Sequence, residues 1–378
     1  MCKVSFVVPV YNKERHIREC ISSIAAQTVP NIEILCVDNN SSDGSIAIVE
    51  EMMSADPRIR LLREPEQGPS HARNCGMAAA TGEYIAFVDA DDFVDPRLVE
   101  LTVDSARRYE SDIVLFSFAR NFEKDDDFVR ASRPVLGANC VKASELIRRG
   151  TPFVSPSVCT KLFRAAFLTK HGFRFDGDLR QAEDLLFSYC AILQSDVVSE
   201  VKDPALYYYR KNADNSATSE RADASESLKV LAAYDRLEDW MSEHDVLGLC
   251  EVAFLQRLLV EIEYTYSWAS ASSSFKVYFD EFRSRYRSRF LQYANHELSM
   301  NDAYREYILP ETFGEALFLK AKRLKECERK NAVSSNKKIS KIKRSQKRVK
   351  KEIEGIKSSW AFRLMSCLAR TVRGSTRK

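Results

Sequence analysis

Short apolar runs recur along the first 120 residues of the chain. They are rich in β-branched side chains and almost free of polar positions, which is the pattern of strands buried on both faces of a sheet. They cover residues 4–8, 32–37, 83–88 and 112–118, with a weaker fifth run at 59–62. We therefore predict a central sheet built from these segments.

The segments between these runs have the spacing of amphipathic helices. Within residues 13–27, apolar side chains recur at the i, i+3, i+4, i+7 spacing that places them on one helix face. Residues 44–54 follow the capping sequence Asp43-Gly44-Ser45, and a helix over 96–109 would begin with a proline in its first turn. Strands that alternate with helices predict an α/β fold with a mainly parallel, three-layer sheet and right-handed crossovers.

Beyond about residue 120 the pattern is less regular. The polar residues 123–127 indicate an exposed loop, and residues 205–210 indicate a further strand. Short helices are predicted over residues 142–149, 160–170 and 181–194. From about 222 to 330 the chain has amphipathic helical faces that carry many aromatic side chains.

These patterns divide the chain into three regions. We predict an α/β domain over residues 1–215, a helical accessory region over 216–330 and a basic amphipathic tail over 331–378. No apolar run approaches the roughly 18 residues that a membrane-spanning helix needs. The N-terminal apolar run stops at Pro9, so it indicates a buried strand and not an export signal.

Composition narrows the class of protein. The chain has 378 residues, of which 45% are hydrophobic and 29% charged, with 12 Gly and 11 Pro. These values exclude collagen-like, low-complexity and wholly disordered proteins. The ten cysteines include no CxxC pair, so the sequence predicts neither a zinc site nor a disulfide framework, and reduced thiols suit the cytoplasm.

Charge is distributed unevenly between the two parts of the chain. The formal net charge is +3, but residues 320–378 contain 21 Lys and Arg against 4 Glu. The rest of the chain therefore holds 36 basic and 50 acidic side chains. An acidic body and a basic tail are expected to meet different partners.

Polar side chains follow three of the predicted strands at the point where each apolar run stops. The first run is followed by Tyr11 and Asn12, the second by Asp38–Asp43, and the run at 83–88 by Asp89–Asp92. In parallel α/β sheets, ligands bind beyond the carboxyl ends of the strands. Although one such segment is usually an ordinary turn, three at the same edge predict a binding site.

The pair Asp89 and Asp91 is the sharpest chemical signal. Carboxylates this close repel each other and raise each other's pKa unless a cation shares them. Mg²⁺ and Mn²⁺ take carboxylate oxygens and complete their coordination with water and substrate phosphates. No His or Cys cluster offers alternative ligands, so the sequence predicts a Mg²⁺ or Mn²⁺ site and not a zinc site.

Taken together, four motifs resemble the inverting family 2 glycosyltransferases with the GT-A fold. The motifs are VSFVVPVYN (4–12), ILCVDNNSSDGS (34–45), QGPSHARNCGMAAATGEYIAFVDADD (67–92) and AEDLLF (182–187). They are dense over residues 1–120 and thinner to about 210. The resemblance implies a nucleotide-sugar donor, a divalent cation held by the Asp-x-Asp motif, and a single displacement at the anomeric carbon of the sugar.

The resemblance also implies roles for residues around the donor. It places Pro9, Tyr11 and Glu14 in the wall of the nucleotide pocket, with Asp38 and Asn39 facing the base. Arg73 would lie near the base or diphosphate, Asp89 near the ribose or metal, and Asp91 would be the principal metal ligand. Many family members have Asp where this chain has Asn39, whose carbonyl still accepts a hydrogen bond, so uridine remains possible.

Glu183 and Asp184 are the expected catalytic carboxylates. An acceptor hydroxyl must lose its proton as it attacks, which requires a base, and a helix N-terminus eases the repulsion between two adjacent carboxylates. By resemblance Asp184 is the base and Glu183 orients the acceptor or its partner groups. Lys161, Arg210 and Lys211 are further candidates for contact with acceptor or diphosphate, with solvated basic side chains as the equal alternative.

The basic tail has several possible partners. Residues 336–373 combine Lys and Arg with an apolar stripe that includes Trp360 and Phe362, which is typical of an interfacial helix on anionic lipid. A membrane surface is favoured over a protein partner, and nucleic acid is the least favoured. The sequence thus predicts a cytoplasmic protein attached peripherally to the inner face of the membrane, with a glycan or lipid-linked acceptor and a possible oligomer.

The sequence leaves two other functions open. A nucleotidyltransferase also uses metal-bridged phosphates on an α/β sheet, but it would more often show a Gly-rich phosphate loop with a lysine, and no GxxxxGK run occurs. A non-catalytic scaffold that binds partners or nucleic acid through its tail would not need the acidic motifs. Asp89, Asp91 and Asp184 are all present, which favours an enzyme.

Overall fold

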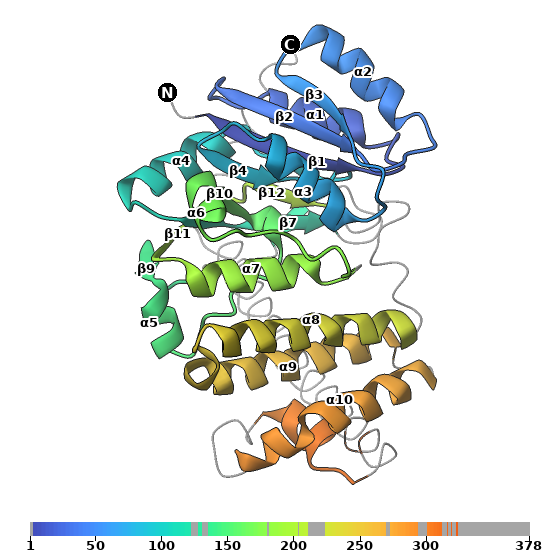
Figure 1. Cartoon of the computed structure of the whole chain (residues 1–378), viewed down its shortest axis with the longest axis vertical. Coiled ribbons are helices and arrows are strands. Elements are labelled where there is room, and N and C mark those ends of the chain that lie inside the picture. Colours follow the sequence, from blue (N-terminus) through green and yellow to red (C-terminus); the bar gives the residue numbers. More distant parts are fainter. Residues whose placement is uncertain are drawn as a thin grey trace, which may run out of the picture. The chain divides into compact units, whose positions relative to one another are not determined.

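The computed structural model describes residues 3–121, 128–130, 135–179, 181–202, 204–210, 224–269, 273–293 and 301–311, together with residues 316, 319 and 323. The chain forms two compact units, Met1–Ile308 and Leu309–Lys378. The α/β region lies in the first unit, together with the helices that follow it (Figure 1).

The main sheet has eight strands in the order β3-β2-β1-β4-β10-β6-β11-β9. Their bounds are β1 Val4–Val10, β2 Ile32–Asp38, β3 Ile59–Arg63, β4 Tyr84–Phe87, β6 Ile113–Phe116, β9 Cys140–Lys142, β10 Lys161–Arg164 and β11 Val197–Val201. Strands β3, β2, β1 and β4 are parallel neighbours, as are β6 and β11. Only β10 and β9 run antiparallel to their neighbours in this sheet, as far as the chain is described. The predicted α/β fold with a mainly parallel sheet is confirmed.

A second, smaller sheet has the order β5-β12-β7-β8. Its strands are β5 Phe93–Val94, β7 Phe118–Asn121, β8 Phe128–Arg130 and β12 Tyr207–Tyr209. Strand β12 pairs antiparallel with β5 and parallel with β7. Because β5 comes directly after the acidic loop at residues 89–92, this sheet holds one end of that loop.

Helices connect the strands and extend beyond them (Figure 1). Their bounds are α1 Ile17–Ala25, α2 Ser45–Ala55, α3 Pro69–Ala79, α4 Leu98–Arg108, α5 Ala143–Arg148, α6 Ala165–Lys170, α7 Glu183–Gln194, α8 Ala224–Glu243, α9 Leu247–Ala269 and α10 Ser273–Gln292. Helix α3 packs against β1 and β2, and α7 packs against α8. Helices α8, α9 and α10 pack on one another, so part of the region predicted to be helical from residue 222 is helical as expected.

The periodicity of the sequence explains the elements that it predicts correctly. In α1 the residues Ile17, Cys20, Ile21 and Ile24 are all buried, as the spacing of apolar positions requires. All seven residues of β2 are buried, because helices and loops cover both faces of this parallel strand. The observed ends of these elements differ from the predicted ones by a few residues.

Two predicted elements are wrong in detail. Residues 160–170 are not one helix, because β10 occupies 161–164 and α6 begins only at Ala165. The first half is extended because it fills the gap between β4 and β6, where Leu162 is the register partner of both Ala86 and Val114. The run at 112–118 is likewise two strands in different sheets, β6 and β7, which separate at Ser117.

Several predictions fall outside the described residues. These are the loop at 123–127, Lys211 and the tail at 331–378. Among the helices of the described residues, none is both long enough and apolar enough to cross a membrane.

Candidate active site

The carboxyl ends of β1, β2 and β4 lie side by side. Val10 is the register partner of Asp38, and its carbonyl accepts the Asn39 N–H at 2.9 Å. On the other side of β1, the Val88 N–H donates to the carbonyl of Val7 at 3.1 Å. The three polar segments that follow these strands therefore share one edge of the sheet, as the sequence predicts.

The loops after β1 and β2 are tied to each other. Asn12, in the left-handed region with φ 51°, accepts a hydrogen bond on Oδ1 from the Ser42 N–H at 2.8 Å. The Glu14 carboxylate accepts the Gly44 N–H at 2.9 Å, at the start of α2. Glu14 is predicted to line the nucleotide pocket. Its described contact holds the loop after β2 in place.

The remaining residues predicted to face the nucleotide lie along the same edge. Pro9 is in β1 and Tyr11 follows it, with 48% of the Tyr11 side chain exposed. Asp38 ends β2, and its Oδ1 accepts the Ser41 N–H at 2.9 Å. Tyr11 is therefore available to a ligand, whereas Asp38 shapes the turn after its strand.

The Asn39 carboxamide forms hydrogen bonds with the loop at residues 64–68 through both its nitrogen and its oxygen. Its Nδ2 donates to the carbonyls of Glu64 and Glu66 at 3.0 and 2.7 Å, and its Oδ1 accepts the Gly68 N–H at 2.8 Å. An Asp here would place a carboxylate against two carbonyl oxygens, so the carboxamide suits this loop. Contact between Asn39 and a base stays a prediction.

The acidic loop after β4 divides its first two carboxylates between different cations. Asp89 Oδ1 accepts a hydrogen bond from Arg73 Nη2 at 3.0 Å. Asp91 Oδ2 lies 2.8 Å from the Lys13 ammonium of the loop after β1. Each carboxylate thus pairs with a different cation, which offsets part of their mutual repulsion.

The third carboxylate of the loop, Asp92, faces inward and is 1% exposed. It accepts the Tyr207 hydroxyl at 2.5 Å and the Arg210 N–H at 2.8 Å. The same Tyr207 oxygen lies 3.3 Å from the Asp89 N–H, which donates to it. One hydroxyl group of strand β12 therefore forms hydrogen bonds with both ends of the acidic loop.

Arg73 connects the acidic loop to the predicted catalytic pair. Its guanidinium, on α3, donates to Asp89 and also to Glu183 Oε1 at 2.6 Å, and its side chain is only 7% exposed. The ring of Phe175 lies 5.4 Å from the guanidinium carbon. The sequence motifs place Arg73 near the base or diphosphate, whereas its described contacts are these two carboxylates.

Glu183 and Asp184 begin α7, after Ala182 adopts a left-handed conformation with φ 61°. Burial raises the pKa of Glu183 to about 6, although the charge of Arg73 acts in the opposite direction. Burial also raises the pKa of Asp184, which likewise lies near the charge of Arg73. A buried carboxylate with a raised pKa is suited to accept a proton near neutral pH.

The basic candidates differ in their surroundings. Lys161 is fully buried in β10 and donates to the carbonyls of Ser155 and Ser157 at 2.7 and 2.5 Å. Burial lowers its pKa to about 7, opposed by the charge of Asp184. Its described hydrogen bonds go to the backbone of residues 155–157, and direct contact with acceptor or diphosphate stays a prediction.

Arg210 lies against the acidic loop. Its guanidinium donates to the carbonyl of Asp91 at 3.2 Å and to Glu19 at 2.8 Å, and it lies over the ring of Phe93 at 5.2 Å. These contacts tie β12 to the loop and to α1. Arg210 is thus adjacent to the predicted metal site, and its contact with acceptor or diphosphate stays a prediction.

Sequence reasoning missed three residues of this site. Lys13 comes directly after the first motif, Asp92 belongs to the acidic motif but received no role, and Tyr207 opens β12. For Lys13 and Asp92 the local sequence held a signal, namely a charged residue beside the motif. Tyr207 is brought to the loop only by the pairing of β12 with β5, which no local pattern reveals.

The donor set fits a hard divalent cation. Asp89 and Asp91 offer carboxylate oxygens, and the Lys13 ammonium already places one positive charge against Asp91. Within the described residues no group of three or more His, Cys, Asp or Glu side chains could hold a metal by itself. Two carboxylates therefore suit an ion that takes its remaining ligands from water and phosphate.

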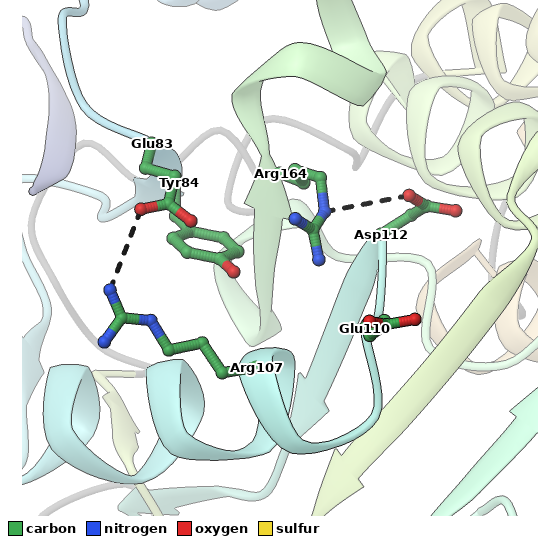
Figure 2. Close-up of a pocket in the computed structure, with 6 residues that line it drawn as sticks. All are labelled: Glu83, Tyr84, Arg107, Glu110, Asp112 and Arg164. Atoms are coloured by element: carbon green, nitrogen blue, oxygen red, sulfur yellow. Dashed lines mark ion pairs between the residues drawn. The ribbon is translucent and has the colours of Figure 1, made fainter. Parts of the chain in front are cut away.

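A separate pocket lies at the opposite edge of the sheet, where β4 and β6 begin. Its cavity of about 360 Å³ is lined by Glu83, Tyr84, Arg107, Glu110, Asp112 and Arg164 (Figure 2). Two of its arginines pair with carboxylates across the pocket at 3.9 Å. It is remote in the fold from the acidic loop, because it lies at the other ends of the strands.

An acidic loop at the carboxyl edge of a mainly parallel sheet, joined to a carboxylate pair on a later helix, defines a GT-A-type α/β domain. The crystal structure of S. aureus TarS 1–349 in complex with UDP-GlcNAc shares this fold. It aligns with a TM-score of 0.52 and 21% identity over 81% of this chain and 90% of that chain. Residues 5–172 match the model of glycosyl transferase family 2.

Curated relatives agree with the family. Putative glycosyltransferase EpsH of Bacillus subtilis is 36% identical over 215 residues, which are 55% of this chain and 60% of that protein. The uncharacterized glycosyltransferase EpsJ of the same organism is 35% identical over 218 residues, 56% of this chain and 62% of that protein. The chain thus spans less than two thirds of the length of these relatives.

Proposed function

We propose that the protein is a metal-dependent glycosyltransferase. It transfers a sugar from a nucleotide-sugar donor, most simply a UDP-sugar, to a hydroxyl acceptor with inversion at the anomeric carbon. The observation that carries the proposal is the Arg73 bridge, because one guanidinium joins Asp89 of the acidic loop to Glu183 of the carboxylate pair. The residues proposed to bind the donor and those proposed to activate the acceptor would therefore lie next to each other.

Each residue of the site has a separate role in the proposed reaction. Asp91 and Asp89 hold a Mn²⁺ or Mg²⁺ ion, which when bound offsets the negative charge of the leaving diphosphate. Asp184 accepts the proton of the attacking hydroxyl, and burial raises its pKa, which makes it a stronger base. Glu183, held by Arg73, orients the acceptor or the base beside it.

The proposed classes of donor and acceptor are based on the substrates of related proteins. TarS is a poly(ribitol-phosphate) β-N-acetylglucosaminyltransferase, and its structure with UDP-GlcNAc supports a uridine donor here. The proposal includes a role in the assembly of cell-surface polysaccharide or glycolipid, which the poly(ribitol-phosphate) activity of TarS supports. A lipid-linked acceptor would suit peripheral attachment to the inner face of the membrane through residues 336–373, which carry many basic side chains.

The proposal is tested by measuring UDP release and glycosylated product from a panel of UDP-sugars with and without Mn²⁺. We expect Asp91→Ala to lose metal-dependent donor binding. We expect Asp184→Asn to keep donor binding and to lose transfer by about 10²–10⁴-fold, because only the base is removed.

Other outcomes would overturn the proposal. Release of pyrophosphate instead of UDP would identify a nucleotidyltransferase. Failure to bind or turn over any nucleotide sugar with Mn²⁺ present would favour a scaffold. Transfer by Asp184→Asn at the unmodified rate would remove the assigned base.

A further inference from the structure

We propose that Lys13 competes with the divalent cation for Asp91, so that its ammonium occupies the metal site until a metal ion displaces it. The inference rests on the proposed function, because it concerns the same cation. It assigns a role to a residue for which the sequence motifs gave none. Lys13 thereby sets the affinity of the donor-free protein for the metal.

The geometry of the pair is the first observation. Lys13 Nζ lies 2.8 Å from Asp91 Oδ2, and the two side chains are only 12% and 15% exposed. Ion pairs of exposed side chains contribute little, but one that is largely removed from water interacts more strongly because the local dielectric is lower. A cation that approaches the same carboxylate oxygen therefore meets a like charge already in place.

The attachment of Lys13 is the second observation. Its N–H donates to Ser45 Oγ at 2.7 Å, and its carbonyl accepts the N–H groups of His16 and Ile17, each at 2.9 Å. The backbone is thus fixed at the start of α1, while the four-carbon side chain ends at Asp91. A lysine can withdraw its compact charge by rotation of this stem without moving the loop.

The surrounding charges explain why this carboxylate is the exchangeable one. Asp89 is held by the buried Arg73, and Asp92 by the buried Tyr207 hydroxyl and the N–H of Arg210. Asp91 alone among the three pairs with a flexible lysine side chain. A divalent ion can therefore take Asp91 by displacing one ammonium, with Arg73 and the Asp92 contacts left intact.

The test measures Mn²⁺ binding to the full-length, donor-free protein from the electron paramagnetic resonance signal of free Mn²⁺. Lys13→Met should bind Mn²⁺ about tenfold more tightly than the unmodified protein, because no ammonium has to leave. Lys13→Arg should bind like the unmodified protein. Arg15→Met, which removes an exposed charge from the same loop, is the matched control and should change the affinity far less.

Labelling gives a second readout that needs no substitution. Acetylation of Lys13 by an N-hydroxysuccinimide ester, followed by mass spectrometry, should be slow without metal and faster with saturating Mg²⁺. An unchanged Mn²⁺ affinity in Lys13→Met would overturn the role of Lys13. A rate of Lys13 acetylation that is the same with and without Mg²⁺ would also overturn it. If Asp91→Ala still abolished Mn²⁺ binding, the proposed function would stand; if no variant bound Mn²⁺, both would fall.

Discussion

At the scale of single residues, Arg73 joins the acidic loop to the predicted catalytic pair. It is buried and contacts carboxylates from two distant parts of the chain, Asp89 and Glu183. Without it, Glu183, whose side chain is only 10% exposed, would lose the cation it pairs with, and the more exposed Asp89 would lose its ion pair. Removing one member of a buried charge network costs more than the network itself contributes.

Replacing Arg73 with Met should therefore lower the free energy of unfolding by about 3–5 kcal/mol and abolish transfer. Arg73→Lys should recover only part of the stability and part of the transfer activity. A single ammonium group cannot contact two carboxylates as the forked guanidinium does. Urea unfolding and UDP release measure the two effects. The control is Arg18→Met, which breaks the exposed pair with Glu51 and should leave stability nearly unchanged.

The pH dependence of stability follows from Glu183. Burial raises its pKa from 4.5 to about 6, so the folded protein holds this proton over a range in which the unfolded chain has lost it. The stability contributed by the protonated group is complete below about pH 4.5 and is lost as pH rises to about 6. Relative to Glu183→Gln, the unmodified protein should lose about 2 kcal/mol across this window.

Urea unfolding of the unmodified protein and of Glu183→Gln at several pH values between 4 and 7 measures this difference. If the difference between the two proteins stays constant across the window, Glu183 is not a buried carboxylate with a raised pKa. A difference of the opposite sign would mean that Arg73 dominates over burial.

At the scale of elements, helix α3 shows where the sequence misleads. Its buried positions are Ser70, Ala72, Arg73 and Gly76, which are small or polar. The hydrophobic period that reveals α1 is therefore missing from α3, although the motif that contains it was recognised. Strand β10 was missed for another reason, since pairing with β4 and β6 overrides its local preference.

Gly76 makes the close packing of α3 on β1 possible. A Cβ at this position would lie 2.3 Å from Val7 Cγ1. Gly76→Ala should therefore lower the free energy of unfolding by about 1–3 kcal/mol through overpacking. Denaturant unfolding measures the change.

Gly248→Ala is the matched control. This glycine is also in a helix, but nothing lies within 4 Å of the added Cβ, so the change should be neutral or stabilising. Equal effects of the two substitutions would show that α3 and β1 are not packed as closely as described.

The positions of the acidic residues of the candidate site were predictable to a larger extent than their supporting contacts. Asp89, Asp91, Glu183 and Asp184 stand out because charged residues follow apolar runs or begin a helix. Their partners Lys13 and Tyr207 come from other strands or loops, so their roles depend on strand order and not on local pattern. The fold class follows from periodicity, whereas the antiparallel β10 and the second sheet depend on long-range pairing.

At the scale of the whole molecule, the chain separates an acidic body from a basic end. Residues 320–378 contain 21 Lys and Arg against 4 Glu, an excess large enough for attraction to an anionic surface. Polybasic segments bind such surfaces in a salt-dependent manner, because the attraction is screened over about a Debye length.

Deletion of residues 331–378 should release the protein from anionic phosphatidylserine vesicles in low salt, as measured by co-sedimentation. The full chain should bind these vesicles and leave them as salt rises, and neutral phosphatidylcholine vesicles serve as the control. Equal binding by the shortened and full-length proteins would reject the tail as the attachment segment.

The central claim is that Asp89 and Asp91 hold a divalent ion that in turn holds a nucleoside diphosphate. A crystal structure of the full chain with Mn²⁺ and UDP, with anomalous data to locate manganese, tests this claim most directly. We expect a manganese peak coordinated by the Asp91 carboxylate, with the diphosphate of UDP bound to the same ion. A well-ordered UDP bound elsewhere, or bound at this edge with no manganese beside Asp91, would contradict it.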